Sequence, residues 1–329
     1  MPADHPPRER GAALLMVLLL VAVISVLAAT ALEKLRLSTR LAGNAAAIEQ
    51  ARAYGYAAET LAAARVTTML GQAGKRVTLV GGWSGKPFGL PIPGGRATAR
   101  VRDGGNCFNL NGLVRQAEAG TYIMNPGAQV QFSRLMRLVG VPASLTDGIA
   151  DAATDWIDSD TAPLAAGAED NAYTGAAVPY RTANTLMADI SELRAVAGVT
   201  PETYARLRPW LCALPVAKPA EINVNTLLPE QAPLFAMLLP DTLSVEAARQ
   251  FLLKRPPQGF ESTEAFWKLP AQSAITPSPD ATAQTSVTTR WFALQVDVAL
   301  GSTELEQHSM IDATILPARL VSRSWGEPS

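Results

Sequence analysis

The chain has 329 residues, with 28 Lys and Arg, 29 Asp and Glu, and a formal net charge of −1 at pH 7. This length predicts two or three compact units, because a single core rarely grows beyond about 250 residues. The near-neutral charge argues against a nucleic-acid-binding protein, since such proteins usually carry a basic face. The 24 prolines and 24 glycines are spread along the chain, which indicates turns rather than a low-complexity tail.

The first predicted element is an uncharged apolar stretch from Gly11 to Leu32, preceded by two arginines and followed by Glu33. At about 1.5 Å per residue, it is long enough to cross a hydrocarbon core of about 30 Å. Basic residues lie only on its N-terminal side, which predicts a cytoplasmic N-terminus and an exported body. The small residues at 29–31 are compatible with signal-peptidase cleavage, so a removed signal peptide and a plain uncleaved anchor stay as alternatives.

The helix is predicted to continue beyond the apolar stretch. Residues 33–70 are rich in Ala, Leu, Arg, Glu and Gln and contain no proline, a composition that favours helix. Their apolar positions form a loose helical stripe: Leu37, Leu41, Ile48, Ala51, Leu61 and Val66. One helix that is apolar in its first half and amphipathic in its second fits an anchor continuous with a folded domain.

The rest of the chain predicts an α+β fold in which helices interrupt a sheet. Alternating residues predict strands at 75–82, 96–103, 286–300, 304–316 and 319–324. Between these strands the pattern is mostly helical, with helices expected at 129–139, 146–157, 190–196, 201–211 and 245–254. We expect the long helix to pack on one antiparallel sheet with a large α-helical insertion, because two strands alone would not cover the helix. Two or three unrelated domains in a row are the alternative.

Cys107 and Cys212 are the only cysteines and bracket the first helical block. In an oxidising compartment an even pair predicts a disulfide, and two buried free thiols are the alternative. Closing a loop of this length is worth about 4 to 5 kcal/mol in the chain-entropy model. A metal site built on the pair alone is not supported, because no histidine or third cysteine lies near either residue in the sequence.

The densest acidic stretch runs from residue 151 to residue 175. Its carboxylates are Asp151, Asp155 and Asp158, spaced for one helix face, followed by Asp160, Glu169 and Asp170. Crowded carboxylates either stay in water or surround a cation, and oxygen ligands without nearby His or Cys favour Ca²⁺ over Zn²⁺ or copper. From the residues alone, a solvated acidic loop and a calcium site both stay open. A catalytic pair, as in a calcium-dependent hydrolase, needs two carboxyls in unlike environments and suits six crowded acids less well.

Residues 222–270 are similar to the helix-hairpin-helix units of DNA-uptake receptors. Such units hold phosphate with backbone N–H groups in a glycine-containing hairpin. The hairpin here, Leu239 to Ser244, has no glycine and carries Asp241, and the near-neutral surroundings offer little counterion release. We expect the helical scaffold without nucleic-acid binding. A membrane-tethered DNA-uptake receptor is the alternative function.

Three motifs together resemble the K-type minor pseudopilins (the GspK family) of the type II secretion system. They are the glycine at the start of the apolar helix, the pattern WIDSD–GAED–Y followed by PYRTAN and ISELR, and the NVNT that opens the second helical segment. In this family a prepilin peptidase cuts after the glycine, here Gly11, and methylates the new N-terminus, here Ala12. Most pilin relatives carry Glu at the fifth mature position, where this chain has Met16, and that departure is typical of the K type.

The resemblance implies that the inserted α-domain binds calcium. The ligands that it implies are Asp158, Asp160, Glu169 and Asp170, with Asp155 and Asn184 as further candidates. It also implies a division of the chain into a leader (1–11), a transmembrane helix (12–32), the helix continuation and first strands (33–106), the inserted α-domain (107–212), a second helical segment (213–285) and C-terminal strands (286–329).

The function implied by the resemblance is structural rather than enzymatic. Such a subunit starts or caps the periplasmic pseudopilus and supports the export of folded proteins across the outer membrane. Its implied partners are the I- and J-type minor pseudopilins, the major pseudopilin and the prepilin peptidase, with secreted proteins and the outer-membrane secretin as further contacts at the tip. The implied location is the inner membrane, crossed once, with a short cytoplasmic N-terminus and a periplasmic body.

Overall fold

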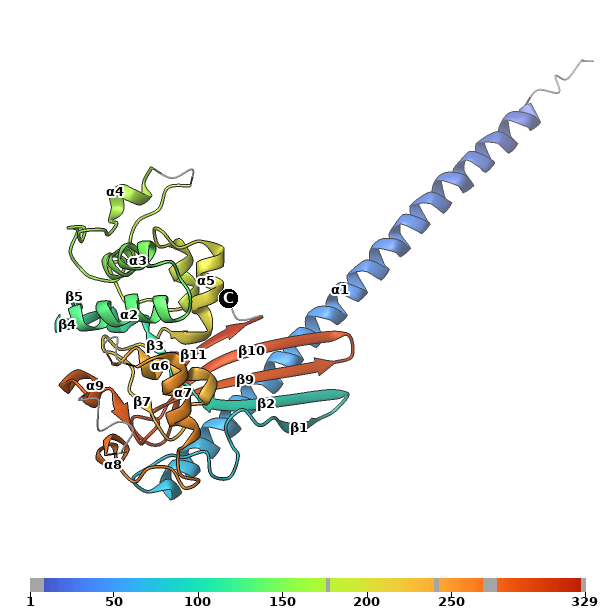
Figure 1. The fold of residues 1–329 in the computed structure, drawn as a ribbon. Helices are drawn as coiled ribbons and strands as arrows, with labels where there is room; N and C mark the ends of the chain where they lie inside the picture. The colour runs from blue at the N-terminus through green and yellow to red at the C-terminus, as the bar shows by residue number, and fades with distance from the viewer. Residues whose placement is uncertain (1–8, 176–177, 240–242, 269–276, 327–329) are drawn as a thin grey trace, which may run out of the picture.

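The computed structural model describes residues 9–175, 178–239, 243–268 and 277–326. Its first element is one continuous helix, α1 (Glu9–Ala73), of 65 residues. The apolar half of α1 projects away from the rest of the protein, whereas the second half packs against it (Figure 1). This confirms the single long helix expected from the sequence. Within the described residues, α1 is the one helix that is long and apolar enough to span a membrane.

A five-stranded antiparallel sheet covers the second half of α1. Its strands, in spatial order, are β1 (Phe88–Ile92), β2 (Gly95–Asp103), β9 (Trp291–Leu300), β10 (Thr303–Asp312) and β11 (Arg319–Trp325). β2 and β9 are hydrogen-bonded neighbours although most of the folded chain lies between them in sequence. The sheet is therefore split by a long insertion, as expected.

Small side chains let α1 approach the sheet closely. Ala51, Ala58 and Ala62 on α1 are fully buried against Leu294 and Val296 of β9 and their neighbours. Alternate residues of β9 face α1, which gives its regular alternation of buried and half-buried positions. This alternation is what the period-2 pattern of a half-buried strand predicts. The helix and the sheet together form the unit that we call the body.

The insertion folds into short helices around a separate apolar core, which we call the head. Its α-helices are α2 (Pro126–Leu138), α3 (Ala143–Asp155), α4 (Asp170–Tyr173), α5 (Pro201–Leu207), α6 (Ala232–Ala236), α7 (Val245–Leu253), α8 (Thr263–Trp267) and α9 (Pro279–Ala283). Its 3-10 helices are η1 (Leu110–Leu113), η2 (Ile190–Ala195), η3 (Arg208–Trp210) and η4 (Pro229–Gln231). Asn125, Thr200 and Ser244 cap α2, α5 and α7 by accepting backbone N–H bonds, which explains where those helices begin.

Three two-stranded pairs connect the head internally and to the body. They are β3 (Phe108–Asn109) with β6 (Leu211–Cys212), β4 (Val114–Glu118) with β5 (Thr121–Met124), and β7 (Ile222–Asn223) with β8 (Thr285–Ser286). Two of the pairs, β3–β6 and β7–β8, are parallel and join segments far apart in sequence. The sequence patterns did not predict any of these pairs. The strands of β3–β6 and β7–β8 have two residues each, which is too short for a measurable period, and β4 shows no alternation because only its first residue is buried.

Several predicted boundaries were wrong. Residues 75–82 form turns rather than a strand, and Gly81 and Gly82 have φ of 85° and 63°; the first strand is β1 instead. Residues 190–195 are a 3-10 helix, while β9 begins at Trp291 and β10 ends at Asp312. Of the predicted glycine-free hairpin, residues 240–242 lie outside the described residues, as do leader residues 1–8.

Candidate cation site and the junction below it

Three acidic side chains meet beyond the end of α3. One carboxylate oxygen each of Asp158, Asp160 and Glu169 lies within 4.8 Å of the others. Asp158 is 3% exposed and Glu169 is 6% exposed, whereas Asp160 faces solvent. Because α3 ends at Asp155, Asp158 does not share its face with Asp151, contrary to the predicted helical spacing. The residues that meet are those of the turn after α3 and of the position before α4.

Three oxygen atoms at this site are buried without a hydrogen-bond donor among the described residues: Asp158 Oδ1, Glu169 Oε1 and Asn184 Oδ1. Asn184 has φ of 49°, and its N–H donates to the Trp156 carbonyl at 3.0 Å, which ties it to the same turn. A buried acceptor without a donor costs about 1 to 3 kcal/mol. A set of oxygen-only acceptors that lacks donors is the set that Ca²⁺ prefers, so these residues fit a calcium ion.

The electrostatics point in the same direction. Burial first, and then the negative charges of Asp160, Asp155 and Glu169, together raise the pKa of Asp158 to about 7. Burial likewise raises the pKa of Asp155 to about 6, although N–H groups of Leu164 and Ala168 oppose the shift. The pKa of Glu169 is also raised, mainly by burial and then by Asp155. The protein therefore concentrates negative charge where water cannot fully solvate it, and a bound cation would relieve that cost.

Asp155 and Asp170 lie outside the three-residue group and hold the surrounding loop. The carboxylate of Asp155, which is fully buried, accepts the N–H of Leu164 at 3.2 Å through each oxygen. Asp170 accepts the N–H of Thr182 at 3.0 Å and its hydroxyl at 2.9 Å, and pairs with Arg181 at 3.3 Å. Both carboxylates thus shape the loop that carries Glu169 and Asn184.

An aromatic cluster packs beside the site. Tyr173 lies 5.5 Å from Trp156 and 5.1 Å from Tyr180, measured between ring centroids. The hydroxyl of Tyr180 donates to the Ala195 carbonyl at 2.9 Å, which fastens the loop to η2. Tyr180 and Thr182 belong to the PYRTAN motif but were not among the predicted ligands, because only the fold brings their loop back onto α3.

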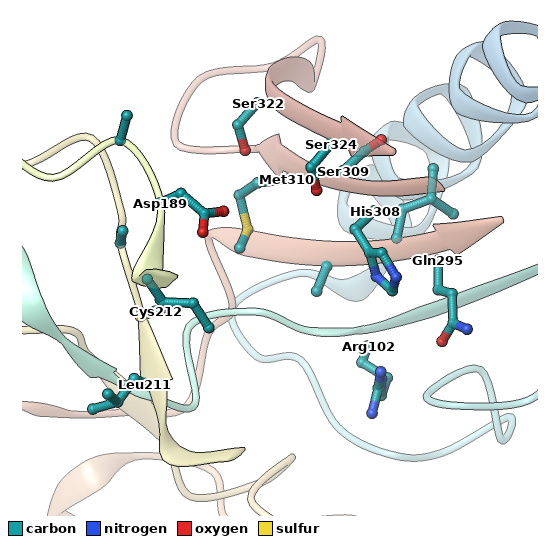
Figure 2. A pocket seen from close by; sticks show the side chains of 15 residues that line it. Arg102, Asp189, Leu211, Cys212, Gln295, His308, Ser309, Met310, Ser322 and Ser324 are labelled. Carbon is teal, nitrogen blue, oxygen red and sulfur yellow. The ribbon is translucent and has the colours of Figure 1, made fainter. Parts of the chain in front are cut away.

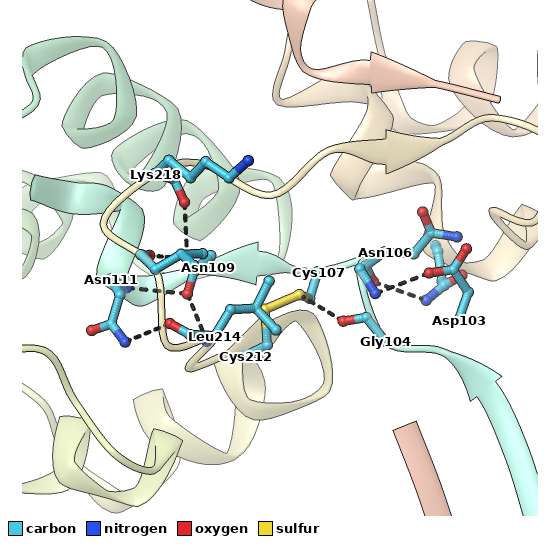
Figure 3. Close-up of a disulfide and its surroundings, with 12 residues drawn as sticks. Asp103, Gly104, Asn106, Cys107, Asn109, Asn111, Cys212, Leu214 and Lys218 are labelled. Atoms are coloured by element: carbon cyan, nitrogen blue, oxygen red, sulfur yellow. Dashed lines mark hydrogen bonds between the residues drawn. A yellow bond between two sulfur atoms is a disulfide. The ribbon is translucent and has the colours of Figure 1, made fainter. Parts of the chain in front are cut away.

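A disulfide joins the two strands at the base of the head. Cys107 and Cys212 are bonded, with Cα atoms 5.8 Å apart and a sequence separation of 105, which confirms the expected pair. Figure 3 shows asparagine side chains on both sides of this bond. The amide of Asn109 donates to the carbonyls of Val216 and Lys218, and that of Asn111 donates to Met187 and Leu214. At this junction, hydrogen bonds from buried asparagine side chains take the place of the backbone hydrogen bonds of a regular β-sheet.

A cavity of about 200 Å³ lies between the head and the outer face of the sheet. Figure 2 shows Arg102, Gln295 and His308 rising from the strands, with Asp189 and Leu211 on the head side. His308 contacts Glu306 at 2.9 Å. Among the residues that the structure describes, the side-chain contact of the His308 imidazole is with Glu306, and Ser324 pairs with His308 only as its neighbour in the sheet.

The comparisons with known proteins agree across nearly the whole chain. The family "Type II secretion system (T2SS), protein K" matches residues 106–216 and 222–290. Type II secretion system protein K of Pectobacterium carotovorum subsp. carotovorum is 33% identical over 322 residues, covering 97% of each chain. The corresponding protein of Aeromonas hydrophila is 34% identical over 309 residues, covering 92% of each.

A solved structure is similar as well. It is the GspK–GspI–GspJ complex from the type II secretion system of enterotoxigenic Escherichia coli, matched with a TM-score of 0.74 and 31% identity over 85% of this chain and 96% of that chain. The single apolar helix and these relatives fit a membrane-anchored protein. The chain belongs to the type II secretion system protein K family.

Proposed function

We propose that this chain is a minor pseudopilin that assembles with I- and J-type subunits at the tip of a type II secretion pseudopilus. The observation that carries the proposal is the match, over 96% of the matched chain, to a GspK solved together with GspI and GspJ. The apolar half of α1 anchors the subunit among neighbouring helices in the inner membrane. The proposed role is assembly, and we expect neither catalytic turnover nor DNA binding.

The shape of the protein supports a role at the end of the filament. The head lies beside the membrane-distal part of the body, away from the apolar half of α1 (Figure 1). A subunit stacked above would have to occupy the space that the head fills, so this subunit starts or caps the filament. Met16 stands where most pilin relatives carry Glu, whose carboxylate pairs with the N-terminus of a neighbouring subunit. A first subunit has no neighbour ahead of it, so that carboxylate would stay unpaired in the membrane, where an unpaired charge is costly.

The N-terminus is proposed to face the cytoplasm and to be cut after Gly11, with methylation of Ala12. Gly11 is exposed in the first turns of α1, and basic residues precede it, as the positive-inside rule requires. Intact-mass measurement with and without a prepilin peptidase tests this. A mass equal to cleavage after Gly11 plus one methyl group, seen only with the peptidase, is expected; a product that begins near Leu32 would contradict it.

Co-expression tests the assembly itself. The full chain is produced with tagged I- and J-type subunits, extracted in mild detergent and purified through the tag. We expect stoichiometric recovery of this chain and restored secretion in a cell that lacks its own K-type subunit. Recovery with an unrelated tagged membrane protein, or normal secretion without this chain, would contradict the proposal.

We further propose that Asp158, Asp160, Glu169 and Asn184 bind one calcium ion, which supplies positive charge to the unsatisfied oxygens. Calorimetric titration of chelator-treated protein with CaCl₂ tests this. The double variant Asp158→Asn with Glu169→Gln is expected to lose binding, because two charged ligands become neutral amides. Asp147→Asn, which removes an exposed carboxylate of α3, is the matched control. Equal binding by both variants would place calcium elsewhere.

A further inference from the structure

The last turns of α1 and three later segments form two adjoining hollows. The larger, of about 720 Å³, lies between α1 and residues 76–83; the smaller, of about 310 Å³, lies between the same loop and residues 252–259. Thr78 and Val80 line both hollows, so the two adjoin at this loop, and we call the pair the distal groove. It lies at the end of α1 opposite the apolar half (Figure 1).

The charge lining the distal groove has one sign. Arg65 and Arg76 line the larger hollow and Arg255 lines the smaller, whereas no Asp or Glu belongs to either lining. None of the three arginines forms an ion pair with another described residue. Glu230 and Glu261 are exposed near the groove in sequence but lie outside its lining. In a chain of net charge −1, this is a local excess of cations.

Two of these arginines are held in place. Arg255 donates to the carbonyls of Val224 at 3.1 Å and Leu227 at 2.7 Å, and burial lowers its pKa. Arg65 lies over the ring of Phe88, with 4.9 Å from its guanidinium carbon to the ring centroid. Ordered guanidinium groups lose less entropy than mobile lysines when they bind a carboxylate.

The rest of the lining combines apolar residues with uncharged polar ones, which are Thr68, Gln72, Thr78, Asn225 and Gln258. Val80 is 52% exposed and Leu253 is 56% exposed, and both stand at the groove beside Pro256, Pro257 and Trp83. An apolar surface with fixed cations suits a chain that presents carboxylates and apolar side chains together. Nucleic acid fits this groove less well, because contacts between phosphates and the arginines would leave Leu253, Pro256 and Pro257 exposed to water.

We propose that the distal groove binds an extended acidic segment of a partner protein, with carboxylates on its arginines and apolar side chains in the hollow between Val80 and Leu253. The groove is independent of the calcium site, so either proposal can fail alone. Its place at the far end of α1 presents it to proteins beyond the membrane rather than to the neighbouring helices of the filament.

The probe is a fluorescein-labelled, end-capped peptide of alternating Asp and Leu, measured by anisotropy against the full chain in lipid nanodiscs. An Asn/Leu peptide of the same length is the ligand control. Arg76→Glu and Val80→Glu are each expected to weaken binding of the acidic peptide by about tenfold, by repelling its carboxylates. Arg115→Glu, on the exposed part of β4, is the protein control and is expected to change binding by less than about twofold.

Thermal unfolding of each variant shows that it is folded; Val80, being half exposed, carries no core contact whose loss would unfold the protein. Binding that needs the carboxylates and is lost in both groove variants supports the proposal. It is overturned if the Asn/Leu peptide binds equally well, if neither peptide binds, if Arg115→Glu weakens binding as much, or if a short single-stranded DNA binds more tightly and loses binding with Arg76→Glu.

Discussion

In the body one helix covers one sheet, whereas in the head many short helices and loops surround a core of large side chains. The body core consists of alanines on α1 against branched residues of the sheet. The head core holds Phe132, Phe235, Phe266 and their neighbours, all fully buried. Regular elements satisfy their own backbone groups, so the body needs few side-chain hydrogen bonds, while the head depends on many.

The polar contacts show the same difference. In the body one buried carboxylate, Glu59 on α1, accepts from Arg323, Gln307 and Ser309 of the last strands. In the head, the asparagines near the disulfide form hydrogen bonds with backbone groups that lie far away in the sequence. Asn111, for example, connects Met187 to Leu214. The contact between α1 and the sheet thus includes one buried carboxylate with three donors, whereas the head junction relies on several buried amides, so we expect different substitutions to destabilise the two regions.

The largest effect is expected at the disulfide. Replacing both Cys107 and Cys212 by Ser should lower the free energy of unfolding by about 4 kcal/mol, because the unfolded chain loses a closed loop spanning a sequence separation of 105. Urea unfolding followed by tryptophan fluorescence measures this. The reduced natural chain serves as the control and should match the double variant. An unchanged midpoint would mean that the asparagine contacts alone hold the junction.

The next effect is expected in the body. Glu59→Ala should destabilise the protein by about 3 kcal/mol, because it removes the acceptor that the buried side chains of Gln307 and Ser309 share, together with the partner of Arg323. Glu49→Ala removes the exposed pair with Arg52 and should cost less than about 0.5 kcal/mol. Chemical denaturation of both variants checks the contrast. Similar losses in the two variants would refute the idea that the buried contact of Glu59 stabilises the body more than an exposed ion pair on the same helix.

A smaller effect is expected at the head junction. Asn111→Ala leaves the Met187 N–H and carbonyl without partners and removes one of the two hydrogen bonds to the Leu214 carbonyl, which should cost about 2 kcal/mol. Asn44→Ala, on the exposed face of α1, is the matched control. Hydrogen exchange should show faster exchange around residues 187 and 214 and unchanged exchange in the sheet. Uniform acceleration throughout the protein would mean that head and body unfold as one unit.

The smallest expected effect is the pH dependence of the acidic site. Burial raises the pKa of Asp158 to about 7 and that of Asp155 to about 6, from 3.8, so the folded state binds protons more tightly than the unfolded state. In chelator, stability should therefore fall as the pH rises from 5 to 8, because both carboxyls lose in this range the protons that the folded state binds more tightly. Saturating calcium should reverse the trend, because it needs ionised ligands. Thermal unfolding across this range, with Asp158→Asn as control, tests it; identical profiles with and without calcium would contradict the cation site.

Sequence patterns were most informative where the structure is regular. The uncharged stretch, the alternation in β2 and β9, and the cysteine pair all lie where they were expected. The strand predicted at 75–82 was wrong, because valines near glycines imitate the alternation of a strand. The chain instead forms turns here, and the indole N–H of Trp83 donates to the Thr78 carbonyl at 2.8 Å. The sequence spacing of the predicted calcium ligands did not distinguish Asp158 from Asp170. One oxygen of Asp158 is buried without a hydrogen-bond donor, whereas Asp170 accepts a hydrogen bond from the Thr182 N–H.

The sequence by itself determined the anchor, the split of the sheet and the family, because these depend on hydrophobic period, chain order and short motifs. Tertiary structure alone decided which oxygens stay without donors, which asparagines fill the junction, and that Arg65, Arg76 and Arg255 line one groove. Those features depend on contacts between residues far apart in the chain. Local periodicity does not predict such contacts, because the sequence neighbours of each of these side chains are the same whether the side chain is buried, paired or free.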